Sequence, residues 1–161
     1  MAPGLPVARR HQPGLIVVDR TIKGPNENYV TPEGLIPPHY LPYPWETCMP
    51  LGNWWNYFPN DAFKSAGVLV RNLCTIVARG GNYLVGIGPG PDGAFDPTVY
   101  ARLKELGAWL KVNGEAIYGT RPLAPYEQGD GVFTTRRDGS ARANPPCAHA
   151  WVLKLAPTAP P

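Results

Sequence analysis

Short apolar runs rich in β-branched residues alternate with helix-patterned segments between residues 14 and 114, and this alternation most constrains the fold. Leu15–Val18, Trp45–Met49 and Asn82–Gly88 have the composition of short strands, the first of them apolar enough to be buried on both faces. Two longer segments with helical spacing follow the second and third strands. Strands that alternate with helices indicate parallel βα units, so we predict an α/β fold.

Capping residues predict where the two helices begin and end. Asp61 is a suitable N-cap for the first helix, and Gly80-Gly81 would stop it. Asp96 followed by Pro97 marks the start of the second helix, which Asn113-Gly114 should end. Apolar residues appear on more than one face of the first helix, so we expect it to be well buried.

The pattern changes after Glu115, where strand-like segments replace the βα alternation. Ile117–Pro122 resembles a linker, and Val132–Thr135 and Ala150–Leu155 are predicted strands, with a turn at Arg137–Gly139. We therefore predict a disordered segment over 1–13, an α/β unit over 14–121, a partial all-β segment over 122–155 and a disordered tail over 156–161.

Composition argues against several classes of function. The net charge is only +3 and Lys and Arg are scattered, which does not favour nucleic-acid binding. No apolar run approaches the roughly 20 residues of a membrane span, and the first residues lack the apolar core of a signal peptide. The three cysteines and three histidines are far apart, so we expect neither a disulfide framework nor a metal site, and no cofactor.

An aromatic stretch between residues 45 and 57 carries the strongest chemical signal. Glu46 stands between Trp45 and Thr47, and Trp54, Trp55 and Tyr57 follow within a few residues. A carboxylate beside flat aromatic rings suits sugar binding, because rings cover the C–H faces of a pyranose and the carboxylate accepts its hydroxyls. A buried strand followed by an aromatic core patch is the alternative.

The order of the motifs resembles the later half of the α-L-fucosidases of glycoside hydrolase family 29. The resemblance is carried by Val18-Asp19-Arg20, Glu27–Glu33, Trp45–Cys48 with Trp54–Tyr57, Ala78–Leu84, Ile87–Gly93 and Asn113–Tyr118. It implies a partial (β/α)8 barrel, with its last three strands and two long helices, followed by a truncated all-β segment. It also implies retaining hydrolysis of α-L-fucosides, at the carboxyl ends of the strands.

The resemblance also implies roles for individual residues. Arg20 would hold sugar hydroxyls, although an ion pair with Asp19 is the alternative. Glu27 falls nearest the general acid/base position and Glu33 is the second candidate, and either could instead be a solvated loop carboxylate. Glu46 would be a carboxylate at the substrate that orients the site, or else part of an ion pair at the strand end.

Aromatic residues complete the implied substrate site. Trp55 aligns with the wall against the C5 methyl of fucose, and Trp45 and Tyr57 are further substrate-binding candidates. Trp54 and Tyr57 could also serve as packing that supports this wall. The implied ligand is a fucosylated glycan or glycoside.

The aspartate nucleophile of the family, in a Trp-x-Asp context, has no counterpart among the 161 residues. A retaining mechanism needs two carboxyl groups, so we expect the chain alone to be inactive, with the N-terminal half or another subunit as partner. Open strand edges would make such a chain a marginal monomer. A non-catalytic carbohydrate-binding module and an unrelated α/β protein are the alternatives. Family members are secreted, periplasmic or lysosomal, which is the expected location.

Overall fold

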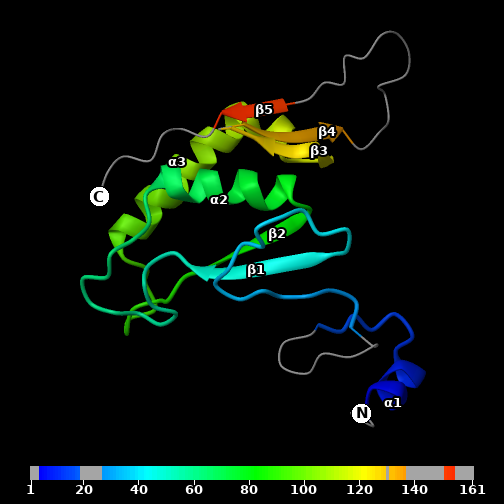
Figure 1. Ribbon diagram of the computed structural model, residues 1–161. Helices are drawn as coiled ribbons and strands as arrows, with labels where there is room; N and C mark the ends of the chain where they lie inside the picture. The colour runs from blue at the N-terminus through cyan, green and yellow to red at the C-terminus, as the bar shows by residue number, and fades with distance from the viewer. Residues whose placement is uncertain (1–3, 19–26, 130, 137–150, 155–161) are drawn as a thin grey trace.

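The computed structural model describes residues 4–18, 27–129, 131–136 and 151–154 and has an α/β portion followed by an antiparallel sheet (Figure 1). Its elements are α1 (Gly4–His11), β1 (Trp45–Pro50), α2 (Ala66–Ala78), β2 (Gly81–Gly86), α3 (Pro97–Asn113), the 3-10 turn η1 (Gly114–Ala116), β3 (Thr120–Gln128), β4 (Gly131–Arg136) and β5 (Trp151–Lys154). The α/β class predicted from the sequence is confirmed.

Strands β1 and β2 form a parallel pair connected by α2. Their register runs from Trp45 opposite Gly81 to Pro50 opposite Gly86, without a shift. A parallel pair needs a crossover connection, and α2 provides it. The prediction of strands in these two segments is therefore confirmed, and both strands end at the same edge.

The predicted strand over Leu15–Val18 is wrong. Only Val18 takes part in a bridge, to Tyr29, while Val30 bridges Trp45 at the start of β1. Residues 29–30 thus lie between Val18 and β1. We expected residues 15–18 to pair directly with β1 as neighbouring strands of one sheet. The side chain of Ile16 is 71% exposed, so this β-branched run is not buried on both faces. Apolar composition alone therefore did not make this run a strand.

The boundaries of the two long helices agree with the sequence at three ends of four. Asp96 caps α3 by accepting a hydrogen bond from the Thr98 backbone N–H at 2.7 Å, and α3 ends at Asn113, as predicted. Helix α2 ends before Gly80-Gly81, also as predicted. Its N-cap, however, is Ser65 and not Asp61, so α2 starts four residues later than expected.

Two segments that we expected to be irregular contain regular structure. Residues 4–11 form helix α1 instead of a disordered segment, and a proline in a first helical turn is compatible with this start. The linker expected over Ile117–Pro122 runs into β3, which begins at Thr120. Strand β3 lies at the edge of its sheet, where prolines are tolerated. The expected turn at 137–139 lies outside the described residues.

Strands β3, β4 and β5 form an antiparallel sheet in that order, and α2 lies between this sheet and the β1–β2 pair (Figure 1). One core cluster joins Leu69 of α2 to Leu51 and Val99. A second cluster joins Cys74 and Ala78 of α2 to Val132 of β4. Helix α2 therefore contributes to both cores, and its predicted burial is confirmed.

Arg79, which follows α2, connects the loop before β1 to β3. Its guanidinium donates to the Pro37 carbonyl at 2.6 Å and to the Glu127 carboxylate at 2.8 and 2.6 Å. The pair Arg102–Glu105 on α3 is instead a surface ion pair within one helix. We therefore expect Arg79 to matter more for stability than Arg102.

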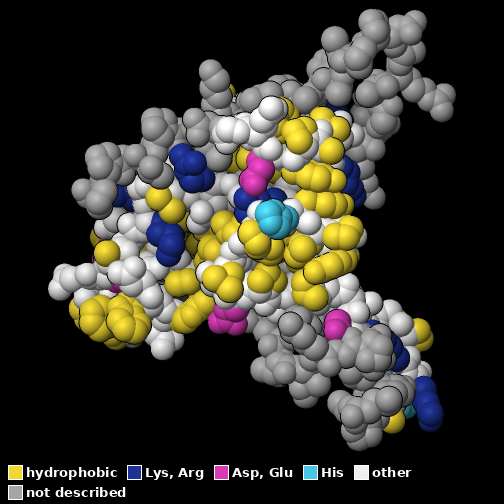
Figure 2. All heavy atoms as spheres, viewed as in Figure 1, with side chains coloured by type: hydrophobic (Ala, Val, Ile, Leu, Met, Phe, Trp, Pro, Cys, Tyr) yellow, Lys and Arg dark blue, Asp and Glu magenta, His cyan; other side chains and the backbone are white. Residues whose placement is uncertain are grey.

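Hydrophobic side chains gather on the face shown in Figure 2 over β1, β2 and the loop before β1. Leu35, Tyr43 and Leu84 are among the exposed large hydrophobic residues. A second group lies over the loop between β1 and α2, at the lower left (Figure 2). Among the helices of the described residues, none is long and apolar enough to cross a membrane.

Candidate functional site

The candidate site lies at the edge where β1 and β2 both end. Leu51, directly after β1, donates its backbone N–H to the Gly86 carbonyl at 2.8 Å, so the two strand ends remain side by side. The loop 51–65 and the loop 87–96 extend from these ends and line two adjoining depressions. In parallel α/β sheets this is the edge at which ligands bind.

Two glycines, Gly86 and Gly88, let the two loops approach each other closely. A Cβ on Gly86 would lie 3.1 Å from the ring of Trp55, and a Cβ on Gly88 only 2.4 Å from the Tyr57 backbone nitrogen. The spacing i, i+2 of these glycines at the end of β2 is the sequence signal for this close approach.

The structure brings Trp55 and Tyr57 together at this edge. Together with Asn56 they line an open groove whose other wall is formed by residues 87–91 (residues: Trp55, Asn56, Tyr57, Ile87, Gly88, Pro89, Gly90, Pro91). Trp55 is 43% exposed and Tyr57 is 41% exposed, so both residues are accessible to a ligand. This is the arrangement that a sugar ring requires of an aromatic wall.

Asp61 and Lys64 hold the loop 51–65 in its shape, and sequence reasoning assigned neither of them this role. Both carboxylate oxygens of Asp61 accept the Asn53 backbone N–H at 3.1 Å, and a Cβ on Gly52 would overlap the Asp61 carboxylate. Lys64 Nζ donates to the carbonyls of Pro50 and Gly52 at 2.7 and 2.9 Å. Burial lowers the pKa of Lys64, and the nearby Asp61 charge opposes this shift.

Trp45 is not available to a substrate, and its prediction as a substrate-binding residue is wrong for this structure. Its side chain has 0% exposure, and its indole N–H donates to the Arg79 carbonyl at 3.1 Å. A Cβ on Gly81 would lie 2.4 Å from the Trp45 ring, so the ring fills the space over that glycine. Because a buried ring cannot cover a sugar face, Trp45 belongs to the core, as the alternative interpretation had it.

Glu46 lies near the start of β1, not at its carboxyl end as we expected. Trp45, Thr47 and Met49 alternate as buried residues on the face toward α2, so Glu46 is on the opposite face. Its side chain is partly buried there, with Asn82 opposite it in the register. Four strand positions separate Glu46 from Pro50, which corresponds to about 13 Å along the strand.

The two candidate acid/base residues occupy different positions along β1. Glu27 lines a depression with Arg9 and residues 13–16, on the side where β1 begins and α1 lies (Figure 1). Glu33 is exposed and precedes Gly34, whose backbone N–H donates to the Cys48 carbonyl at 2.9 Å. Of these two glutamates, Glu33 is therefore closer to the edge that holds Trp55. Asp19 and Arg20 lie outside the described residues.

Among the described residues, no group of three or more His, Cys, Asp and Glu side chains could hold a metal ion. Cys48 and Cys74 are both free thiols. Burial raises the pKa of Cys74 to about 12, which keeps this thiol protonated at neutral pH.

Residues 4–115 match the family model described as Alpha-L-fucosidase. The plasma alpha-L-fucosidase of Homo sapiens is 42% identical over 93 residues, which cover 52% of this chain and 19% of that relative. The tissue alpha-L-fucosidase of Homo sapiens is 36% identical over 99 residues, covering 58% and 21%. The chain thus spans about a fifth of the length of these curated relatives.

Solved structures extend the similarity into the antiparallel sheet. Alpha-L-fucosidase isoenzyme 1 from Paenibacillus thiaminolyticus superposes with a TM-score of 0.73 at 31% identity, over 81% of this chain and 35% of that one. The Thermotoga maritima alpha-fucosidase gives a TM-score of 0.69 at 30% identity, over 82% and 31%. The chain is similar to these proteins in both sequence and fold.

Proposed function

This chain belongs to the alpha-L-fucosidase family, and from that premise we propose that it supplies part of a site for retaining hydrolysis of α-L-fucosides. The observation that carries the proposal is the position of Trp55, which packs over Gly86 and is 43% exposed at the edge where two parallel strands end. In this proposal β1 and β2 are two strands of a partial (β/α)8 barrel, and β3–β5 form the start of an all-β segment.

Sugar recognition falls to Trp55, Tyr57 and Arg20. The exposed Trp55 indole would lie against the apolar C5 methyl side of fucose, where a ring excludes water without demanding a hydrogen bond. Tyr57 would border the same groove. Arg20 would donate charge-assisted hydrogen bonds to the sugar hydroxyls. The ligand of this site would be a fucosylated glycan or glycoside.

Glu33 is our candidate for the general acid/base. The next residue, Gly34, hydrogen-bonds to Cys48, which is two strand positions or about 7 Å from the end of β1, whereas Glu46 is about 13 Å from that end. A retaining mechanism pairs such a residue with a nucleophilic carboxylate about 5–5.5 Å away. No Trp-x-Asp segment occurs in the sequence, so we assign the nucleophile to polypeptide outside these 161 residues.

Complementation tests this proposal. The full chain is mixed with the N-terminal half of a fucosidase, and hydrolysis of an aryl α-L-fucoside is measured. We expect turnover from the mixture and none from this chain alone, since loss of a covalent nucleophile costs orders of magnitude. Trp55→Ala and Glu33→Gln should lower turnover, and Tyr118→Ala, which removes an exposed ring of a different region, should not. Turnover by the purified chain would contradict the proposal.

A carbohydrate-binding module without catalysis is the second candidate. It is favoured by the separation of Glu27 and Glu46 from the groove at Trp55 and Tyr57. In this case the mixture would remain inactive, yet L-fucose would bind to the chain, and Trp55→Ala would weaken that binding. Glu33→Gln would leave binding unchanged.

A further inference from the structure

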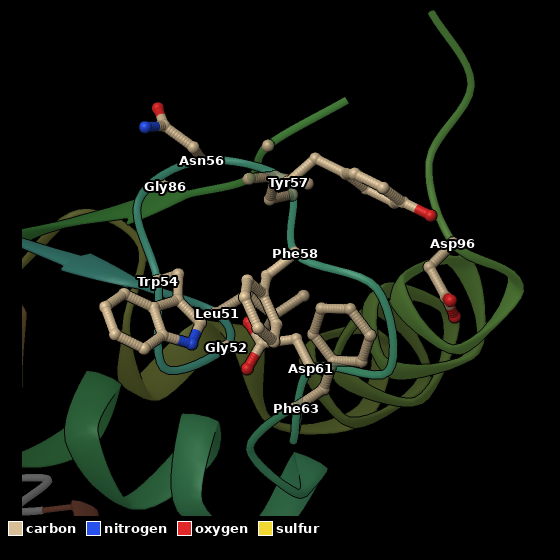
Figure 3. Close-up of a pocket in the computed structure, with 12 residues that line it drawn as sticks. Leu51, Gly52, Trp54, Asn56, Tyr57, Phe58, Asp61, Phe63, Gly86 and Asp96 are labelled. Atoms are coloured by element: carbon tan, nitrogen blue, oxygen red, sulfur yellow. The ribbon is translucent and has the colours of Figure 1, made fainter. Parts of the chain in front are cut away.

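Two further aromatic rings lie on the loop 51–65 and are not used by the proposed fucose site. Trp54 is 58% exposed and Phe58 is 52% exposed, and their ring centroids are 5.6 Å apart with planes inclined by 33°. Figure 3 shows the two rings next to each other, while the Tyr57 side chain extends away from them toward Asp96. The pair lines a depression that adjoins the groove at Trp55, and we call this pair the Trp54–Phe58 platform.

A fixed carboxylate accompanies this platform. Asp61 lines the same depression as Trp54 and Phe58, and its position is set by the bifurcated hydrogen bond from the Asn53 backbone. Lys64 lies close enough to oppose part of the Asp61 charge. Carboxylate oxygens have more than one acceptor site each, so Asp61 can also accept a ligand hydroxyl.

We propose that the Trp54–Phe58 platform binds a neutral pyranose of the glycan, next to the deoxyhexose that Trp55 contacts. Two inclined rings cover the C–H face of a sugar, and Asp61 accepts hydroxyl hydrogens at its margin. A wholly apolar ligand would offer no hydrogen-bond donor to the Asp61 carboxylate, which favours a hydroxylated ligand. The depression of the platform shares Asn56, Tyr57, Ile87 and Gly88 with the groove that Trp55 lines, so the platform borders the proposed fucose wall. The identity of the glycan rests on the proposed function.

Binding of three sugars to the full chain tests this inference. The probes are L-fucose, lactose and 2′-fucosyllactose, and their dissociation constants are measured by NMR titration. We expect 2′-fucosyllactose to bind about tenfold more tightly than L-fucose, the gain from covering roughly 55 Å² of apolar surface. The double variant Trp54→Ala/Phe58→Ala should abolish this gain and leave the L-fucose constant unchanged.

Further variants separate the platform from the fucose wall. Trp54→Phe/Phe58→Tyr keeps two rings and should keep the gain, whereas Trp55→Ala should weaken L-fucose binding. All these side chains are substantially exposed, and thermal unfolding checks that each variant is folded. The experiment therefore reports on ligand contact.

The outcomes distinguish the two proposals. Equal affinity for L-fucose and 2′-fucosyllactose, or a gain that survives the double alanine variant, overturns the platform and leaves the proposed function intact. Binding of lactose through Trp54 and Phe58 without binding of L-fucose supports the platform and contradicts the proposed function. Absence of binding by all three sugars contradicts both.

Discussion

Replacing Gly88 with alanine should displace the loop that carries the candidate site. The new Cβ would lie 2.4 Å from the Tyr57 backbone nitrogen and 2.6 Å from the Asn56 carbonyl carbon, and ordinary contacts begin near 3.4 Å. Since the obstructing atoms are backbone, the loop must retreat by about 1 Å. Overpacking of this kind costs about 1–3 kcal/mol, and a 1 Å misplacement of substrate contacts can cost about a hundredfold in rate.

Gly107→Ala is the matched control for this substitution. Gly107 lies within α3, and a Cβ there would meet no atom within 4 Å, so alanine should stabilise the helix by up to about 1 kcal/mol. Urea unfolding gives the free-energy change, and the indole N–H signal of Trp55 in NMR spectra reports the loop position. The reasoning is refuted if Gly88→Ala keeps both the wild-type stability and the wild-type Trp55 signal.

Three further changes probe the core. Gly81→Ala places a Cβ 2.4 Å from the buried Trp45 ring and should destabilise the fold by about 1–3 kcal/mol in urea unfolding; an unchanged midpoint would contradict this packing. Arg79→Ala should lower the free energy of unfolding by about 2 kcal/mol, because it removes hydrogen bonds to a charged group. Arg102→Ala should lower it by less than about 0.5 kcal/mol. Equal losses would be inconsistent with the connection that Arg79 makes between the loop before β1 and β3. Burial raises the Cys74 pKa from 9.0 to about 12, so its contribution to stability is present below pH 9 and is lost as the pH rises toward 12. Cys74→Ala should therefore reduce the decline in stability over this range, and an identical decline would exclude the thiol as its cause.

Local chemistry made the α/β portion predictable from the sequence. Asp96 followed by Pro97 determines a helix start without help from distant residues, and the structure confirms it. The strand segments at 45–49 and 82–88 were found because β-branched and apolar residues cluster there, although β2 starts and ends slightly earlier. The motif order also made Trp55 and Tyr57 candidate site residues, and the structure brings them to one groove.

The errors arose where distant contacts decide the structure. Asp61 is a suitable N-cap residue, but its carboxylate accepts a hydrogen bond from the Asn53 backbone N–H, and Ser65 caps α2 instead. Trp45 stands beside a glutamate in the sequence, but alternation along β1 turns it toward α2 and into the core. Leu15–Val18 has strand composition, but only one residue of it finds a bridging partner. None of these partners can be identified from neighbouring residues.

The position of α2 has a consequence for how the chain can be divided. The predicted boundary near residue 121 separates an α/β unit from an all-β unit, but Cys74 and Ala78 of α2 pack against Val132 of β4. A version shortened at Gly119 would keep the β1–β2 pair and α3 against α2, but it would expose the side of α2 that carries Cys74 and Ala78 to solvent. The hairpin of β3 and β4 therefore acts as the outer cover of α2, and its removal should leave an aggregating remnant instead of a smaller folded unit.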